Sequence, residues 1–104
     1  MSAEGQDHPD KRIRDLDTQL GEVTAQRQAI DQEWSASGSH DDLDRYTLHS
    51  RRATTAEDKI AVLEAMKSTD PSFKAADVAR ELSRQREELS RSQEAARRYR
   101  PGST

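Results

Sequence analysis

The sequence contains no cysteine, which excludes disulfide bonds and thiol chemistry and leaves the compartment open. Its four glycines are scattered, at Gly5, Gly21, Gly38 and Gly102, so a glycine-rich phosphate loop is absent. No apolar run reaches the roughly 20 residues that a membrane-spanning helix needs. The stretch Met1–Pro9 is polar, so we expect no signal peptide and a cytoplasmic location.

Large apolar side chains are also scarce. Leucine, isoleucine, valine and phenylalanine together make up 14 of 104 residues, too few for a thick globular core. Charged residues make up 36%, with 17 basic and 20 acidic side chains nearly in balance. Balanced charge at this level indicates long amphipathic helices that meet along narrow seams, and not a disordered chain.

The most regular pattern lies between Ile13 and Trp34. Its large apolar residues are spaced three, four, three, seven and four apart, and Arg27 fills the gap of seven. This is the spacing of an a/d heptad seam, which must be buried against another helix. The seam consists of Ile13, Leu16, Leu20, Val23, Arg27, Ile30 and Trp34.

A second helix follows a breaker at Gly38, which is suited to the left-handed conformation that ends many helices. Ser39 and Asp42 have the spacing of a capping box at the start of this helix. Folding the chain about Gly38 brings Ile30 opposite Tyr46 and predicts an antiparallel hairpin. Its second seam is Tyr46, His49, Ala53, Ala56, Ile60 and Leu63, with Leu16 opposite Ile60. Threonines at 54 and 55 resemble a fresh helix start, but we expect the helix to continue.

Asp70 and Pro71 form a strong helix-start signal, so a third helix is predicted from Pro71. Its seam is Ala75, Val78, Leu82, Gln85, Leu89, Ser92, Ala96 and Tyr99. Within that seam Val78, Leu82, Leu89 and Tyr99 are expected to meet either the hairpin or a second protomer.

The predicted fold is all-α: an antiparallel coiled-coil helical hairpin with a third amphipathic helix, as a three-helix bundle or an extended coiled coil. We expect one helical domain over residues 10–100, with helices at about 10–35, 40–67 and 71–99. Residues 1–9 are predicted to form a disordered tail, and residues 101–104 a short C-terminal one.

Chemical motifs are hard to find. An acidic cluster with a histidine, His40, Asp41, Asp42 and Asp44, could in principle hold a divalent cation, but it is interpreted as a helix N-terminus that complements the helix dipole. Narrow seams rarely enclose a catalytic pocket, so we expect no enzyme activity, cofactor or metal. Opposite Arg27 the expected hairpin places His49. This pair forms either a register-setting or pH-sensitive layer, or an arginine that extends to solvent beside a half-exposed histidine.

The third helix is rich in arginine, which raises nucleic-acid binding as an alternative function. The candidate contacts are Arg84, Arg91, Arg97, Arg98 and Arg100. Glutamates between them would repel a phosphate backbone, which favours a solvated helix that faces the acidic N-terminal half. A salt titration separates the two, because phosphate binding weakens steeply as salt rises.

Trp34 is expected to cover the end of the hairpin core against Leu43. A hairpin with tryptophan near its turn resembles the WXG-type small secreted helical proteins, so a secreted effector is a further alternative. Trp34 and Gly38 are four residues apart, however, where that family has two, so no residue roles are transferred. The leading expectation is a non-enzymatic protein–protein interaction module that associates with itself or with a protein partner.

Overall fold

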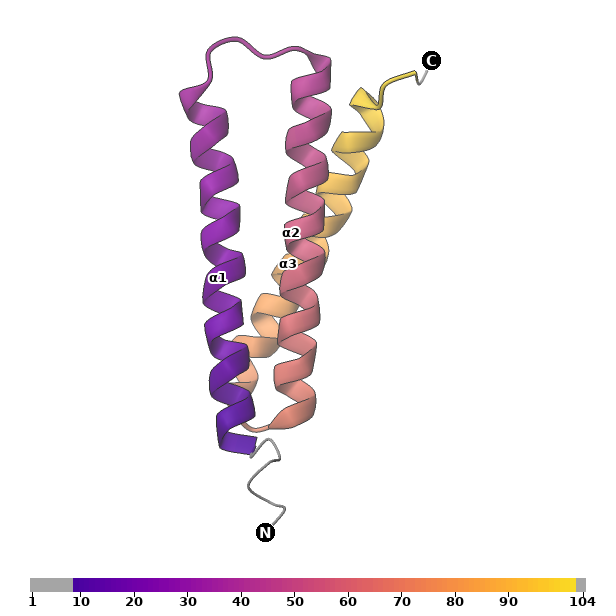
Figure 1. Ribbon diagram of the computed structural model, residues 1–104. Helices are drawn as coiled ribbons and strands as arrows, with labels where there is room; N and C mark the ends of the chain where they lie inside the picture. The colour runs from indigo at the N-terminus through magenta and orange to yellow at the C-terminus, as the bar shows by residue number, and fades with distance from the viewer. Residues whose placement is uncertain (1–8, 103–104) are drawn as a thin grey trace.

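The computed structural model describes residues 9–102 and contains three helices connected by two turns (Figure 1). They are α1 (Pro9–Ala36), α2 (Asp42–Thr69) and α3 (Ala75–Tyr99). No strand occurs within this described range, so the predicted all-α, three-helix architecture is confirmed. Of the two predicted tails, residues 1–8 and 103–104 lie outside the described residues.

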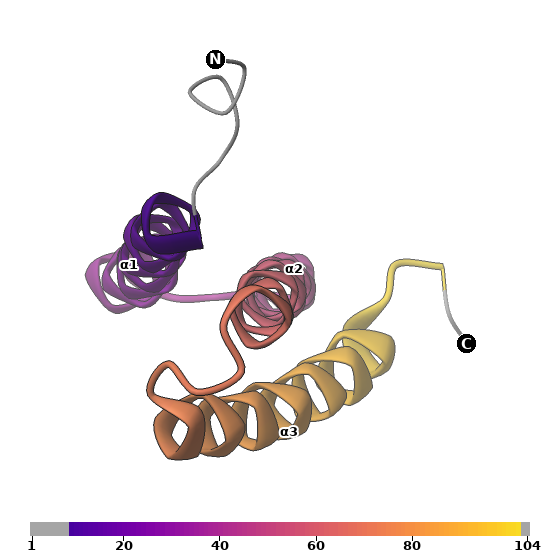
Figure 2. The same cartoon turned by 90° about the horizontal axis from the view of Figure 1, so that it is seen from below.

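The three helices are not packed equally. α2 packs against both other helices, whereas no Cα atom of α1 lies within 8 Å of a Cα atom of α3 in the described range. Figure 2 shows why: α1 and α3 lie on different sides of α2, and α3 runs obliquely across α2, so its C-terminal half points away from α1. The molecule is elongated, 59 × 23 × 23 Å, with α2 as its central helix.

The largest apolar cluster lies near the turn between α2 and α3. Side chains of all three helices meet there. The cluster consists of Ile13, Leu16, Leu63, Met66, Val78 and Leu82, with Leu20, Ile60, Val62, Ala65 and Phe73 packed against it. Leu16 belongs to this cluster and Ile60 packs against it.

The register of the hairpin differs from the predicted one. Arg52 binds Asp31 at 2.8 Å and Arg51 binds Glu33 at 2.9 Å between the facing sides of α1 and α2. Folding about Gly38 would instead have placed residue 45 opposite Asp31 and residue 43 opposite Glu33. The observed partners lie seven and eight residues further along α2, so the predicted register was wrong.

The displaced register arises because α2 needs two apolar stripes, one for each neighbour. The first part of the stripe assigned to α1 faces α3 instead: His49 stacks on Tyr99, and Ala53 lines a cavity with Ala96 of α3. Leu63, at the other end of the stripe, lies in the cluster where all three helices meet. On the α1 side, Leu48 is buried and shares a cavity with Ile30 and Trp34. The predicted register was displaced because it assigned a single stripe of α2 to α1.

α2 continues through its paired threonines, which confirms the expectation of an unbroken helix. Thr55 is buried, and its hydroxyl donates a hydrogen bond of 2.8 Å to the carbonyl oxygen of Arg51. A buried hydroxyl without a partner would be costly. This bond back to the preceding turn is what lets threonine remain inside the helix.

The start of α2 is two residues later than its predicted capping box. Gly38 does not have a positive φ, and the N-cap is Asp41. The Asp41 carboxylate accepts a 2.8 Å hydrogen bond from the Asp44 backbone N–H, and the Asp44 carboxylate accepts one of 3.1 Å from the Asp41 N–H. Both bonds of a capping box are thus present, with aspartate at each position.

This cap makes a direct prediction about stability. Asp41→Ala should lower the free energy of unfolding by about 0.5–2 kcal/mol, because it leaves an N-terminal N–H of α2 without its acceptor. The matched control is Ser39→Ala, at the position that the sequence favoured, which should change stability by less than about 0.5 kcal/mol. Urea unfolding followed by circular dichroism measures both. Equal losses would show that Asp41 is not the cap.

The second turn also differs from expectation, because α3 begins at Ala75 and not at Pro71. The Asp70 carboxylate accepts hydrogen bonds from the backbone N–H and hydroxyl of Ser72, which holds residues 70–73 in a turn. Lys74 then adopts φ +46°, in the left-handed region, before the helix starts. This longer turn allows the ring of Phe73 to pack against the apolar cluster.

Candidate interaction surface

An open groove lies between α1 and α3, with α2 as its floor. Its volume is about 670 Å³. The groove exists because the oblique path of α3 keeps its backbone away from α1 while both helices rest on α2 (Figure 2). Its lining residues are Asp17, Leu20, Thr24, Arg27, Lys59, Leu63, Met66, Lys74, Asp77, Val78, Arg80, Glu81, Arg84, Gln85 and Glu88.

The groove combines an apolar base with charged edges. Leu63, Met66 and Val78 lie at its base and belong to the apolar cluster, and Leu20 packs beside them. The remaining lining is mostly polar, with four acidic and five basic side chains. An apolar base between edges of mixed charge matches the surface of an amphipathic helix, which has one apolar stripe and charged flanks.

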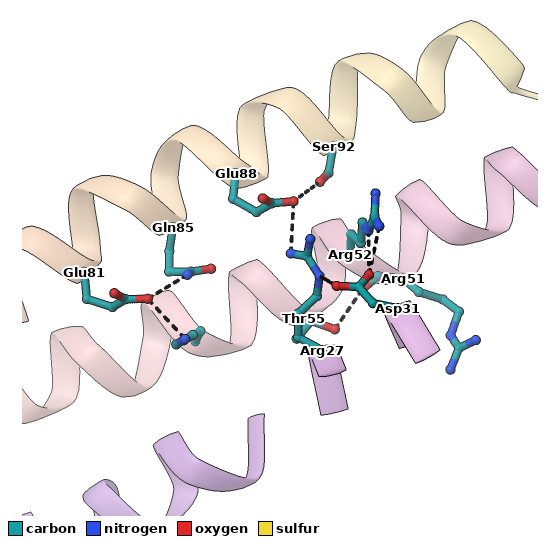
Figure 3. Close-up of polar contacts among 10 residues, drawn as sticks. Arg27, Asp31, Arg51, Arg52, Thr55, Glu81, Gln85, Glu88 and Ser92 are labelled. Atoms are coloured by element: carbon teal, nitrogen blue, oxygen red, sulfur yellow. Dashed lines mark hydrogen bonds and ion pairs between the residues drawn. The ribbon is translucent and has the colours of Figure 1, made fainter. Parts of the chain in front are cut away.

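An ion network spans the groove between α1 and α3 (Figure 3). Arg27 of α1 contacts Glu88 of α3, with 3.1 Å between Nη1 and Oε2. The Nε of Arg27 also donates to Asp31 at 3.1 Å, and Asp31 in turn accepts hydrogen bonds of 3.0 and 2.8 Å from Arg52 of α2. Four charged side chains therefore connect the three helices where the backbones of α1 and α3 are apart.

Both carboxylates of the network have further partners. Burial raises the pKa of Asp31. The hydrogen bond and charge of Arg52, together with those of Arg27, lower this pKa by more, so the net shift is downward. Ser92 is only 3% exposed, and its hydroxyl donates a 2.8 Å hydrogen bond to Glu88. Both acidic groups are thus paired.

A second polar cluster lies on the α3 wall of the groove. Glu81 accepts a 2.8 Å hydrogen bond from Gln85 and forms ion pairs with Lys59 of α2 at 3.1 Å and with Arg84 at 3.0 Å. Burial raises the pKa of Glu81, but Gln85 and Lys59 lower it more, and the pKa is lowered overall. Figure 3 shows this cluster beside the Arg27 network.

Comparison with known proteins does not assign the chain to a family. No protein-family model matches the chain, and neither the curated proteins nor the solved structures contain a match. The function of the groove is therefore argued from its own geometry and charge.

The four residues predicted for an interface occupy two different environments. Val78 and Leu82 are 5% and 2% exposed in the apolar cluster, so they meet the hairpin of their own chain. Leu89 and Tyr99 are half-buried nearer the other end of α3. The ring of Tyr99 lies 6.0 Å from that of His49, with 13° between the ring planes.

The two residues of the expected polar layer have different partners. Arg27 binds Asp31 and Glu88, whereas His49 lies against Tyr99. Burial and the charge of Arg52 lower the pKa of His49, and the charge of Glu88 opposes this. Both residues thus belong to the polar region around Glu88.

Most of the candidate nucleic-acid contacts already have acidic partners. Arg84 lies 3.0 Å from Glu81, and Arg97 and Arg98 lie 2.7 and 4.0 Å from Glu94. Arg91 and Arg100 are exposed. The α3 surface therefore has interspersed charges of both signs and not a continuous row of free cations.

Trp34 lies against the turn between α1 and α2, where it stacks on His40. The rings of Trp34 and His40 stack with centroids 3.5 Å apart, and His40 Nε2 lies 3.1 Å from the carbonyl oxygen of Trp34. Leu43 is 57% exposed. The imidazole is thus the group that covers the tryptophan.

Residues 9–102 contain no group of three or more potential histidine, cysteine, aspartate or glutamate ligands placed to hold a metal ion. Among the same residues, none of the helices has the length and hydropathy needed to cross a membrane.

Proposed function

We propose that the chain is a non-enzymatic, cytoplasmic protein–protein interaction module that self-associates through the groove between α1 and α3. The observation that carries this proposal is that both helices pack on α2 while their backbones stay apart, with no Cα atom of α1 within 8 Å of a Cα atom of α3 among the described residues. A fourth helix in that position would complete a bundle, which is the common way in which an amphipathic helix binds another protein.

The charge distribution favours a second copy of the chain as the occupant. Residues 1–44 contain four basic and eleven acidic residues, and residues 45–104 contain thirteen and nine. The halves therefore have net charges of −7 and +4. A two-fold arrangement that sets the acidic half of each copy against the basic half of the other brings unlike charges together, which suppresses wrong orientations and favours a closed dimer.

Thr24→Arg tests this proposal, because Thr24 is half-buried in α1 and lines the groove. A long cation there should occupy the space of the incoming helix and raise the dimer dissociation constant about tenfold or more, equivalent to about 1.4 kcal/mol. The matched control is Ala25→Arg, one residue along the same helix but exposed. It should leave the dissociation constant within about threefold of the original.

Sedimentation equilibrium over a range of concentrations measures both variants, and circular dichroism verifies that each retains its helix content. A monomeric unmodified chain throughout the range, or equal weakening by the two substitutions, would contradict the proposal. A partner from another chain would then be the occupant to seek.

A further inference from the structure

The groove between α1 and α3 ends at an ion pair that joins these two helices. Among the residues that line the groove, Arg27 is the last of α1 and Glu88 is the last of α3. The Arg27 guanidinium lies 3.1 Å from the Glu88 carboxylate, although no Cα atom of α1 comes within 8 Å of one of α3 in the described range. The Arg27–Glu88 pair therefore spans the groove by its side chains alone.

Each member of this pair keeps a second partner when the pair opens. Arg27 Nε donates to Asp31 of the same helix at 3.1 Å, and the Glu88 oxygen that contacts Arg27 also accepts a 2.8 Å hydrogen bond from the Ser92 hydroxyl (Figure 3). The two side chains are 30% and 23% exposed, so water also reaches them. An ion pair with this exposure opens at a cost equivalent to about twofold to fivefold in an equilibrium constant.

A helix that enters the groove is longer than the groove. The lining residues of α1 run from Asp17 to Arg27, which is about 15 Å at 1.5 Å per residue. The helices of the chain have 25–28 residues, which corresponds to about 38–42 Å. Beyond the ion pair α1 continues to Ala36 and α3 to Tyr99. A helix of a second copy that follows α1 past Arg27 therefore meets the pair.

We propose that the Arg27–Glu88 pair restrains self-association: it closes this end of the groove in the free chain, and it opens when a helix of a second copy occupies the groove. This inference rests on the function proposed above and adds a regulatory contact to it. The free energy of dimer formation then includes the cost of opening the pair. Removal of the pair should therefore tighten the dimer, whereas removal of a contact that binds the second copy would weaken it.

Glu88→Gln tests the restraint, because it removes one charge of the pair and keeps the shape of the side chain and an oxygen that accepts from Ser92. The dimer dissociation constant should fall about twofold to fivefold. The matched control is Glu87→Gln, the same change at the neighbouring exposed residue, which does not line the groove. This control measures the effect of net charge, and its dissociation constant should stay about twofold or more above that of Glu88→Gln.

Arg27→Gln opens the same pair from the side of α1. Asp31 stays bound to Arg52 by hydrogen bonds of 3.0 and 2.8 Å, so this contact between α1 and α2 is kept. This variant should tighten the dimer by a similar factor. The double variant with Glu88→Gln should be no tighter than the tighter single variant, because one pair can be lost only once. Independent effects of the two charges would instead multiply.

Sedimentation equilibrium measures these dissociation constants, and circular dichroism verifies the helix content of each variant. The restraint is overturned, with the groove still the interface, if Glu88→Gln is no tighter than Glu87→Gln, if Arg27→Gln does not tighten the dimer, or if the two effects multiply. Failure of the groove itself gives a different result: the unmodified chain stays monomeric, or Thr24→Arg and Ala25→Arg weaken the dimer equally. Either of those results overturns both proposals.

Discussion

Leu63→Ala should lower the free energy of unfolding by about 2–5 kcal/mol, the largest loss expected from any single truncation in this chain. Leu63 is 1% exposed, and it lies in the cluster where apolar side chains of α1 and α3 meet α2. Truncation removes buried methyl groups and leaves a cavity that three helices cannot all close. With only 14 large aliphatic or phenylalanine side chains in the sequence, little other burial compensates.

The control is Leu43→Ala, which makes the same chemical change at a residue that is 57% exposed. It should change stability by no more than about 0.5 kcal/mol. Urea unfolding monitored by circular dichroism compares the two. Similar losses in both variants would contradict the placement of the core beside the turn between α2 and α3.

Ala56→Leu should also destabilise the fold, by about 1–3 kcal/mol, although it adds apolar surface. Ala56 is 2% exposed in α2, and the central helix has neighbours on two sides. A larger side chain there has to displace packed atoms. Because leucine and alanine have similar helix propensities, the loss reports packing and not helix formation.

Ala61→Leu makes the same change at an exposed position five residues further along α2. It should alter stability by less than about 0.5 kcal/mol. Thermal unfolding of both variants measures the difference. Stabilisation by Ala56→Leu would mean that the central helix is not closely packed at that residue.

Heptad spacing was sufficient to predict the three helices and their hairpin connections. It was not sufficient for the register, because α2 has two apolar stripes and the spacing of one stripe does not reveal which neighbour it faces. In the sequence, Leu48 and Met66 were the available signal of a second apolar stripe on α2. Both are large, apolar and outside the predicted seam, and both are buried, so they mark the second face.

The helix ends could not be predicted exactly from the sequence, because alternative local hydrogen bonds of similar strength compete there. Ser39 with Asp42 and Asp41 with Asp44 have the same spacing, and only the folded turn selects the second pair. At the other turn, Asp70 can cap a helix or bond to Ser72. Packing of Phe73 against the core favours the second arrangement.

The groove between α1 and α3 could not be predicted from the sequence for a different reason. The groove depends on the oblique crossing of α3 over α2, which narrow stripes do not specify. Arg27 was identified as an irregular position in the first seam, but its partner Glu88 was not, because the two are far apart in the sequence. Long-range ion pairs of this kind have no local spacing by which they can be recognised.

The most direct test of the proposed function is an isotope-filtered nuclear Overhauser experiment on a mixture of labelled and unlabelled chains. It detects only contacts between copies. If a second copy occupies the groove, the methyl groups of Leu20 and Thr24 should show intermolecular signals, and the outward methyl group of Ala25 should show none. Intermolecular signals confined to Ala25, or none at concentrations where the chain is dimeric, would contradict self-association through the groove.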